Sequence, residues 1–171
     1  VTVTPVMKAL GSSRDYVSVY AGAQYTLPIL DGFARVSVES QTDLTRDDIP
    51  SAYVAGTTRF VSPRFGLGRV VMDATVMHRY RNYSNQQQSL GGDNRLRGLP
   101  SNYFIGKDAL SYNFEYRTRP VEILSCQFGA VLFYDVGDAF NGFDNLRIHQ
   151  SAGIGARVLF PQFDRLVLRG D

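Results

Sequence analysis

The stretch Tyr16–Thr42, which reads "YVSVYAGAQYTLPILDGFARVSVESQT", decides the fold class of this chain. Apolar or small residues alternate with polar residues on both sides of the turn "ILDG", Ile29–Gly32. A period of two is the pattern of a β-strand with one apolar and one polar face, and Asp-Gly between two such runs is a strong β-hairpin signal. The stretch therefore predicts two long antiparallel strands joined by a tight turn.

The same alternation recurs along most of the remaining chain, and helical periodicity is nearly absent. Counting these runs, the sequence predicts about eight antiparallel strands, several of them about 10 residues or longer. A tilted membrane-spanning strand needs about 9–11 residues, whereas strands of soluble proteins are usually nearer 5–6. The further alternating runs cover residues 69–80, 110–119, 127–137, 151–160 and 165–171.

Alternation alone leaves open which face of the strands points outward. A soluble ligand-carrying barrel hides its apolar face inside, whereas an outer-membrane barrel turns that face to lipid. The long strands, the small and medium apolar side chains, and aromatic residues near strand ends favour lipid, although the Trp usual in such aromatic girdles is absent. The predicted fold class is therefore all-β, an antiparallel transmembrane β-barrel. The aromatic residues in question are Tyr25, Phe60, Tyr80, Tyr83, Tyr112, Tyr116, Phe140 and Phe160.

Composition sets further bounds on the function. The 171 residues are enough for one domain, and we expect residues 1–171 to form one β-barrel region. The formal net charge of +2 gives no indication of nucleic-acid binding, and no run of about 18 apolar residues predicts a membrane helix. The one cysteine, Cys126, and the distant His78 and His149 predict no metal site. No Ser-His-Asp grouping or phosphate-cradling loop points to an enzyme or a cofactor.

One connection, at about residues 84–108, is long for a link between β-strands, and such connections are usually functional or disordered. Its centre reads "GGDNRLRGLPSNYF", Gly91–Phe104, and combines glycines with several large apolar side chains. This mixture is typical of a segment packed against a surface, because a flexible linker carries few apolar groups.

Four blocks in the second half of the chain carry a resemblance to a known family. They are "GGDNRLRGLPSNYFIGKDALSYNFEYR" at 91–117, "GAVLFYDVGDAF" at 129–140, "SAGIGARVLFP" at 151–161 and "RLVLRGD" at 165–171. In order and spacing they resemble the outer-membrane protein assembly factor superfamily, the BamA/TamA-like or bacterial surface antigen family. The resemblance implies a barrel of about sixteen strands, of which this chain supplies about half. The chain is then a portion of a longer protein, a short member that closes alone, or one of two copies sharing a barrel.

The resemblance also assigns a role to the long connection. In the family, the sixth extracellular loop folds back into the barrel lumen, and its tip carries an Arg-Gly-aromatic motif. The matching positions here are Leu96-Arg97-Gly98-Leu99, with Leu99 in place of the aromatic residue. The resemblance implies that the Arg97 guanidinium is held by Glu115 and Asp135 on the inner barrel wall.

The residues themselves agree with this assignment. Glu115 and Asp135 both fall on the polar parity of their predicted strands and would point into the lumen. Gly98 allows a tight turn at the tip, and Gly91-Gly92 let the loop enter the lumen. Glycines 129, 137, 153 and 155 would leave room for the loop on the inner wall. Without the flanking blocks, Arg97 would be read as a solvated loop cation.

The function that the resemblance implies is insertion or translocation of proteins at the bacterial outer membrane. The partners would then be the lipid bilayer with lipopolysaccharide, client outer-membrane or secreted proteins, and another copy or further strands to close the barrel. The alternative is a passive pore or structural outer-membrane barrel without transport activity, which keeps the fold alone. A soluble ligand-carrying barrel is the third reading.

Overall fold

The computed structural model of the chain describes residues 1–46, 48–92, 95–160 and 166–170. The described chain is all-β, with two short 3-10 turns, η1 (Lys8–Leu10) and η2 (Phe143–Asn145). No helix in these ranges is long and apolar enough to cross a membrane. The strands are β1 (Thr2–Val6), β2 (Tyr16–Ile29), β3 (Gly32–Leu44), β4 (Ser51–Val61), β5 (Gly68–Asn82), β6 (Gln88–Leu90), β7 (Phe104–Gly106), β8 (Asp108–Thr118), β9 (Val121–Ile123), β10 (Cys126–Phe140), β11 (His149–Phe160) and β12 (Leu166–Gly170).

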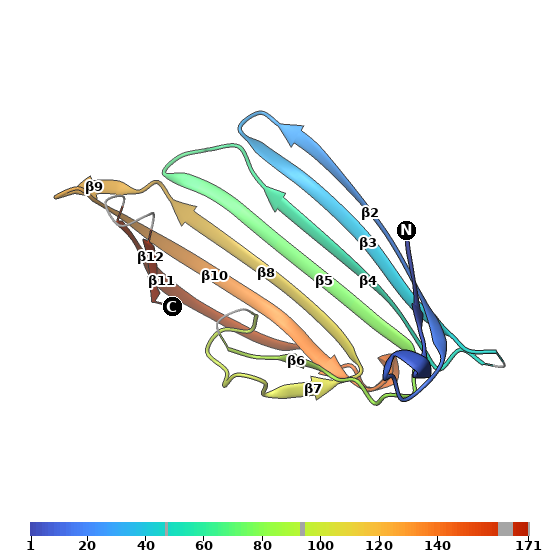
Figure 1. The fold of residues 1–171 in the computed structure, drawn as a ribbon. Coiled ribbons are helices and arrows are strands. Elements are labelled where there is room, and N and C mark those ends of the chain that lie inside the picture. Colours follow the sequence, from blue (N-terminus) through green and yellow to red (C-terminus); the bar gives the residue numbers. More distant parts are fainter. Residues whose placement is uncertain (47, 93–94, 161–165, 171) are drawn as a thin grey trace.

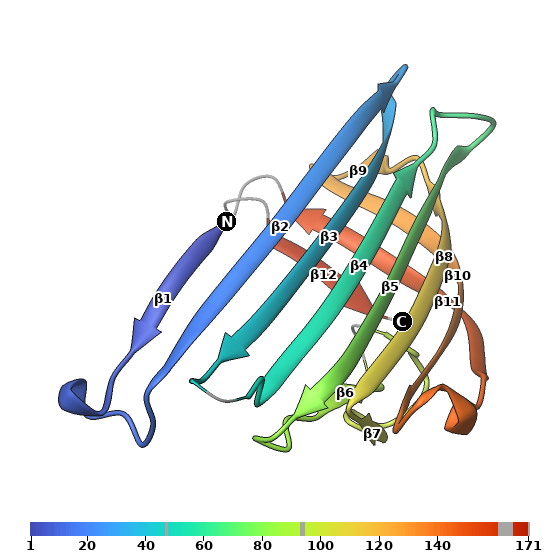
Figure 2. The same ribbon diagram turned by 90° about the vertical axis from the view of Figure 1, so that its right-hand side faces the viewer.

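Nine strands form one antiparallel meander in the order β1-β2-β3-β4-β5-β8-β10-β11-β12. The short β9 continues the line of β8 and pairs with the start of β10. Each long strand pairs with the next long strand of the chain, as the hairpin pattern predicted, and Figure 1 shows this succession across the sheet. The sheet is strongly curved (Figure 2), but β1 and β12 remain its two edges and do not pair with each other in the described chain. The described residues therefore form an open sheet.

The strands are long, as the sequence predicted. Both β5 and β10 have 15 residues, and β2 has 14. The alternation did not single out β4, which lies between β3 and β5. Gly56, Thr57 and Thr58 at its centre reduce the difference in polarity between its faces, and its register shifts between Ala52 and Tyr53.

The two faces of β10 differ in exposure, because the long connection covers one of them. Val131 and Asp135 on one parity are 1% and 0% exposed, whereas Leu132 on the other parity is 55% exposed. On the neighbouring β11, the outward Ile154 is 75% exposed. A soluble barrel would enclose the aliphatic parity, since that burial drives its folding. In this structure the aliphatic side chains of β10 and β11 lie on the face of the sheet that the loop does not cover.

The long connection lies on the other, concave side of the sheet, where Figure 1 shows β6 and β7 below β8 and β10. β6 and β7 pair as a separate two-stranded ladder, and the described residues 91–92 and 95–103 between them are called the tip. A small apolar cluster joins this segment to the concave face of the sheet, which is called the wall below. It is formed by Leu90, Leu96, Ala109 and Ala139, with Leu99 and Phe104 packed against it.

Candidate functional site

Arg97 is the centre of a buried ion-pair cluster between the tip and the sheet, and its side chain is 4% exposed. Its Nε and Nη2 donate to the two carboxylate oxygens of Asp135, each at 2.7 Å. Its Nη1 donates to Glu115 at 2.6 Å, and its backbone N–H donates to Asp135 at 3.1 Å. The guanidinium carbon lies 3.8 Å from the centre of the Phe133 ring. Such a two-pronged contact is geometrically demanding, so it positions the tip in one orientation.

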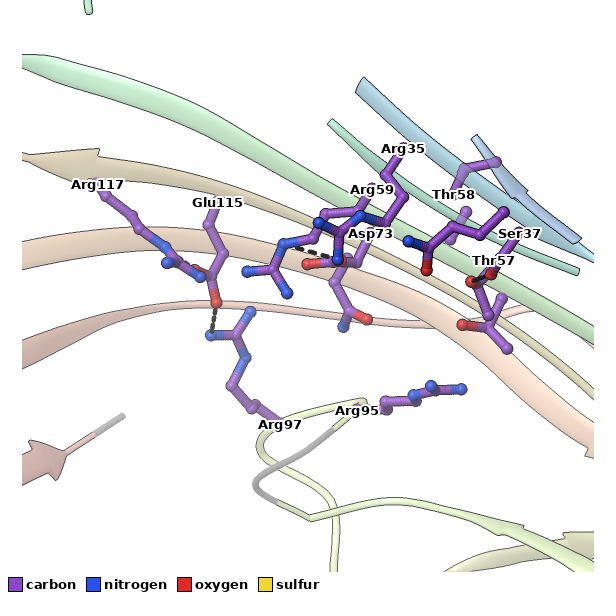
Figure 3. A pocket seen from close by; sticks show the side chains of 14 residues that line it. Arg35, Ser37, Thr57, Thr58, Arg59, Asp73, Arg95, Arg97, Glu115 and Arg117 are labelled. Atoms are coloured by element: carbon purple, nitrogen blue, oxygen red, sulfur yellow. Dashed lines mark hydrogen bonds and ion pairs between the residues drawn. The ribbon is translucent and has the colours of Figure 1, made fainter. Parts of the chain in front are cut away.

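Glu115 is shared among three arginines from three parts of the chain. One carboxylate oxygen accepts from Arg97, and the other accepts from Arg117 at 2.6 Å and from Arg157 at 3.1 Å. Figure 3 shows Arg97 rising from the loop to Glu115, with Arg117 reaching the same carboxylate from β8. Glu115 therefore pairs with Arg97 of the loop and with Arg117 of its own strand at the same time.

The electrostatics of the tip depend on this cluster. Burial alone lowers the pKa of the Arg97 guanidinium, and the hydrogen bonds and charges of Asp135 and Glu115 outweigh that effect and hold the pKa above its ordinary value. Arg95, two residues earlier, lies beside the same wall and donates to the Ser111 hydroxyl at 3.2 Å. Burial lowers the pKa of Arg95, and the charge of Asp73 opposes this shift only in part.

The remaining tip residues have distinct environments. Leu96 is fully buried in the apolar cluster even though its φ is +59°, an unusual value for a residue with a side chain. Leu99 packs against the same cluster, so the side chain that follows Gly98 is held by apolar contacts. Gly98 has a φ of +84°, and a Cβ added there would meet no atom within 4 Å, so conformation and not space favours glycine.

Gly91 and Gly92 stand at the base of the tip, directly after β6. Their φ angles are +124° and +83°. A Cβ on Gly91 would lie 2.3 Å from the Pro100 carbonyl oxygen, and a Cβ on Gly92 would lie 2.6 Å from the Ser101 hydroxyl. The Gly92 N–H also donates to the Leu99 carbonyl at 3.0 Å. These two glycines therefore let the tip close tightly on itself.

The wall glycines serve the loop in different ways. A Cβ on Gly137 would lie 2.6 Å from the Leu110 carbonyl oxygen of β8 and 3.4 Å from Leu96, so this glycine serves the close pairing with β8 and also lies beneath the tip. A Cβ on Gly153 would lie 2.5 Å from the Phe133 ring. Gly153 therefore makes room for the aromatic ring that packs under Arg97, and it leaves room for the loop only through that ring.

Sequence reasoning missed a second buried carboxylate, Asp108, at the end of the loop. It is 0% exposed and accepts the backbone N–H groups of Arg79 at 2.8 Å and Gly142 at 2.9 Å. His78 Nδ1 lies 2.9 Å from the same carboxylate. Asp108 thus ties the returning loop to β5 and to the connection after β10. A signal was present, since an acidic residue directly after "IGK" begins the strand that carries Glu115.

A cleft of about 510 Å³ lies beside the ion-pair cluster, between the tip and the concave faces of β2, β3, β4, β5 and β8. It is lined by arginines, hydroxyls and few carboxylates, as Figure 3 shows. Within the described ranges, no three His, Cys, Asp or Glu side chains gather closely enough to hold a metal ion. The arrangement offers hydrogen-bond donors and positive charge to whatever enters the cleft.

Comparison of the chain with protein-family models, with curated proteins and with solved structures finds no match in any of the three. The family membership expected from the four sequence blocks therefore stays a prediction.

Proposed function

We propose that this chain forms part of the wall of an outer-membrane β-barrel of the BamA/TamA-like superfamily, acting in insertion or translocation of proteins at the outer membrane. The observation that carries the proposal is the buried contact of Arg97 with Asp135 and Glu115. Those three residues come from two of the four blocks on which the family resemblance rests. Their contact holds a long internal segment against the polar side of the sheet, which is the task that the resemblance assigns to it.

The exposed aliphatic face supports the membrane part of the proposal. Side chains such as Val38, Leu132 and Ile154 project from the convex side and are 52%, 55% and 75% exposed. A water-soluble protein rarely exposes a contiguous apolar surface of this kind, whereas a barrel wall in lipid requires it. The polar parity and the internal segment would then face the lumen.

The open sheet needs additional strands in this setting. Backbone N–H and C=O groups at a sheet edge find no partner in hydrocarbon, and each costs several kcal/mol there, about as much as burying an unpaired amide. β1 and β12 would therefore pair with strands from a longer protein or from a second copy. Either arrangement encloses the tip and the cleft.

Paired arginine substitutions on the two faces test the membrane orientation. Val38 lies on the exposed aliphatic face of β3, and Gln24 lies on the polar face of β2 one register step away. We expect Val38→Arg to weaken folding into lipid vesicles by about 2–4 kcal/mol near the bilayer centre, and Gln24→Arg to cost about 1 kcal/mol or less. Equal effects, or a folded monodisperse protein in buffer without detergent, would reject the orientation.

A cellular assay separates assembly activity from a passive pore. Depletion of the protein in its own cells, followed by a quantitative census of outer-membrane proteins, measures whether other barrels depend on it. We expect the amounts of several outer-membrane proteins to decrease together on depletion. Expression of the parent chain should restore these amounts, and expression of a variant lacking the Arg97 contact should not. An unchanged census would favour the passive barrel, which keeps the fold without the activity.

A further inference from the structure

The cleft beside the tip holds more positive charge than its carboxylates balance. Arg35 on β3 and Arg59 on β4 lie directly opposite each other across the β3–β4 ladder and both line the cleft. Like charges in this position repel, so the arrangement is unfavourable unless something offsets it. Asp73 on β5 lies 3.7 Å from Arg59, while Arg35 donates to the Thr26 hydroxyl at 3.2 Å. Asp73 thus pairs with Arg59, whereas the partner of Arg35 is a neutral hydroxyl.

A third guanidinium approaches the cleft from the opposite side. Arg95 lies on the tip side of the cleft, and Arg35 and Arg59 lie on the sheet across from it (Figure 3). Its hydrogen-bond partner is the neutral Ser111 hydroxyl, and no carboxylate of the described chain forms an ion pair with it. Arg97 and Arg117, which also line the cleft, pair with Asp135 and Glu115, and Glu115 is also shared with Arg157.

Apart from the ion-pair cluster, the described charged residues that line the cleft are Arg35, Arg59, Arg95 and Asp73, which together carry a net charge of +2. A phosphate monoester carries about −1.5 to −2 charges at neutral pH and accepts hydrogen bonds through three oxygens. Arginine forks match this geometry, and hydroxyls such as those of Ser37 and Thr57 supply further donors. The volume of about 510 Å³ lies in the range of small-molecule sites.

We propose that this cleft binds a small phosphate-bearing solute, held between the wall arginines Arg35 and Arg59 and the loop arginine Arg95. The wall and the tip each contribute part of the site, so the seated tip is a condition for binding. The site faces the concave side, away from the aliphatic face, which favours a free solute over the phosphate of a lipid headgroup. This proposal does not depend on whether the protein assembles other proteins.

The experiment is calorimetric titration of the folded protein with inorganic pyrophosphate at constant ionic strength. We expect Arg35→Gln and Arg95→Gln to weaken binding about tenfold to a hundredfold, the effect of losing one charge-assisted hydrogen bond. Asp73→Asn should tighten binding, because it removes the carboxylate that competes for Arg59. Arg64→Gln is the matched control: it removes the same charge from an exposed arginine that pairs with Asp31 outside the cleft, and should leave binding unchanged.

Two further measurements identify the kind of ligand and the state of the tip. Titration in micelles containing phosphatidic acid shows whether a lipid headgroup competes with pyrophosphate, and competition would overturn the assignment to a free solute. Amide exchange at Arg97 shows whether the tip remains seated in each variant, so that a loss of binding is not mistaken for a displaced loop. Absence of binding by the parent, or equal binding by all five proteins, would overturn the proposed site.

Discussion

Replacing Arg97 by methionine removes the guanidinium but keeps a long apolar side chain between the tip and the wall. The change leaves the fully buried Asp135 without the two guanidinium hydrogen bonds that it accepts at 2.7 Å. Glu115 is less affected because Arg117 and Arg157 continue to donate to it. The cost therefore falls mainly on the buried carboxylate of Asp135, which keeps the backbone N–H of residue 97 but loses its guanidinium partner.

The magnitude follows from the burial of the pair. Removing one partner of a buried ion pair costs about 3–5 kcal/mol, because the remaining charge is left without compensation in a poorly solvated site. Since about 1.4 kcal/mol corresponds to a factor of ten, opening of the tip should become about 150-fold to 5,000-fold more frequent. The sheet itself retains its ladders, so the change should be confined to the tip and its immediate contacts.

Hydrogen exchange of backbone amides measures this opening directly. The informative amides are those of Arg97, which donates to Asp135, and of Gly92, which donates to Leu99. Arg46→Met, at an exposed position, is the control for loss of an arginine. The double variant Arg97→Met/Asp135→Leu should recover part of the loss, because it removes the isolated charge. An acceleration of less than about fivefold in Arg97→Met would refute the reasoning, since the pair would then contribute under about 1 kcal/mol.

Three other substitutions probe the same segment. Leu96→Ala should destabilise the seated tip by about 2–5 kcal/mol, since Leu96 is fully buried, while Leu67→Ala at a 77% exposed position should have little effect in the same exchange assay. Asp108→Ala should cost about 1–3 kcal/mol for each of the two backbone N–H groups it leaves unsatisfied, measured by urea unfolding; a loss below about 0.5 kcal/mol would contradict its anchoring role. Gly106→Ala places a Cβ 2.3 Å from backbone atoms of β10 and should displace the loop base, whereas Gly56→Ala, with its nearest atom at 3.5 Å, should not; a crystal structure or exchange map of each variant decides.

Most strands could be predicted from the sequence because alternation is a local property of the backbone. Successive side chains of an extended strand point to opposite faces, so parity assigns Leu132 and Asp135 to opposite sides without any tertiary information. The prediction failed for β4, where glycine and threonine occupy both parities and a bulge interrupts the pattern. Pairing with β3 and β5 holds this segment in the sheet even though its own sequence signal is weak.

The main partners in the ion-pair cluster could be predicted from strand parity and from the family resemblance, but the surrounding contacts could not. Parity put Glu115 and Asp135 on the polar face, and the resemblance named Arg97 as their partner. Neither indicated that Phe133 packs under the guanidinium, or that Gly153 makes room for that ring. These contacts join residues on different strands, so they depend on the register between β10 and β11.

By itself, the sequence determined most of the long strands, their two faces and the existence of a long packed connection, because each follows from residue types at short range along one chain. Only the tertiary structure decided that Arg35 faces Arg59, that Asp108 ties the loop to two other elements, and that the sheet remains open at β1 and β12. These features arise from register and curvature, which bring together side chains far apart in sequence. Short-range alternation is the same for every register that keeps the parity, so it cannot select among them.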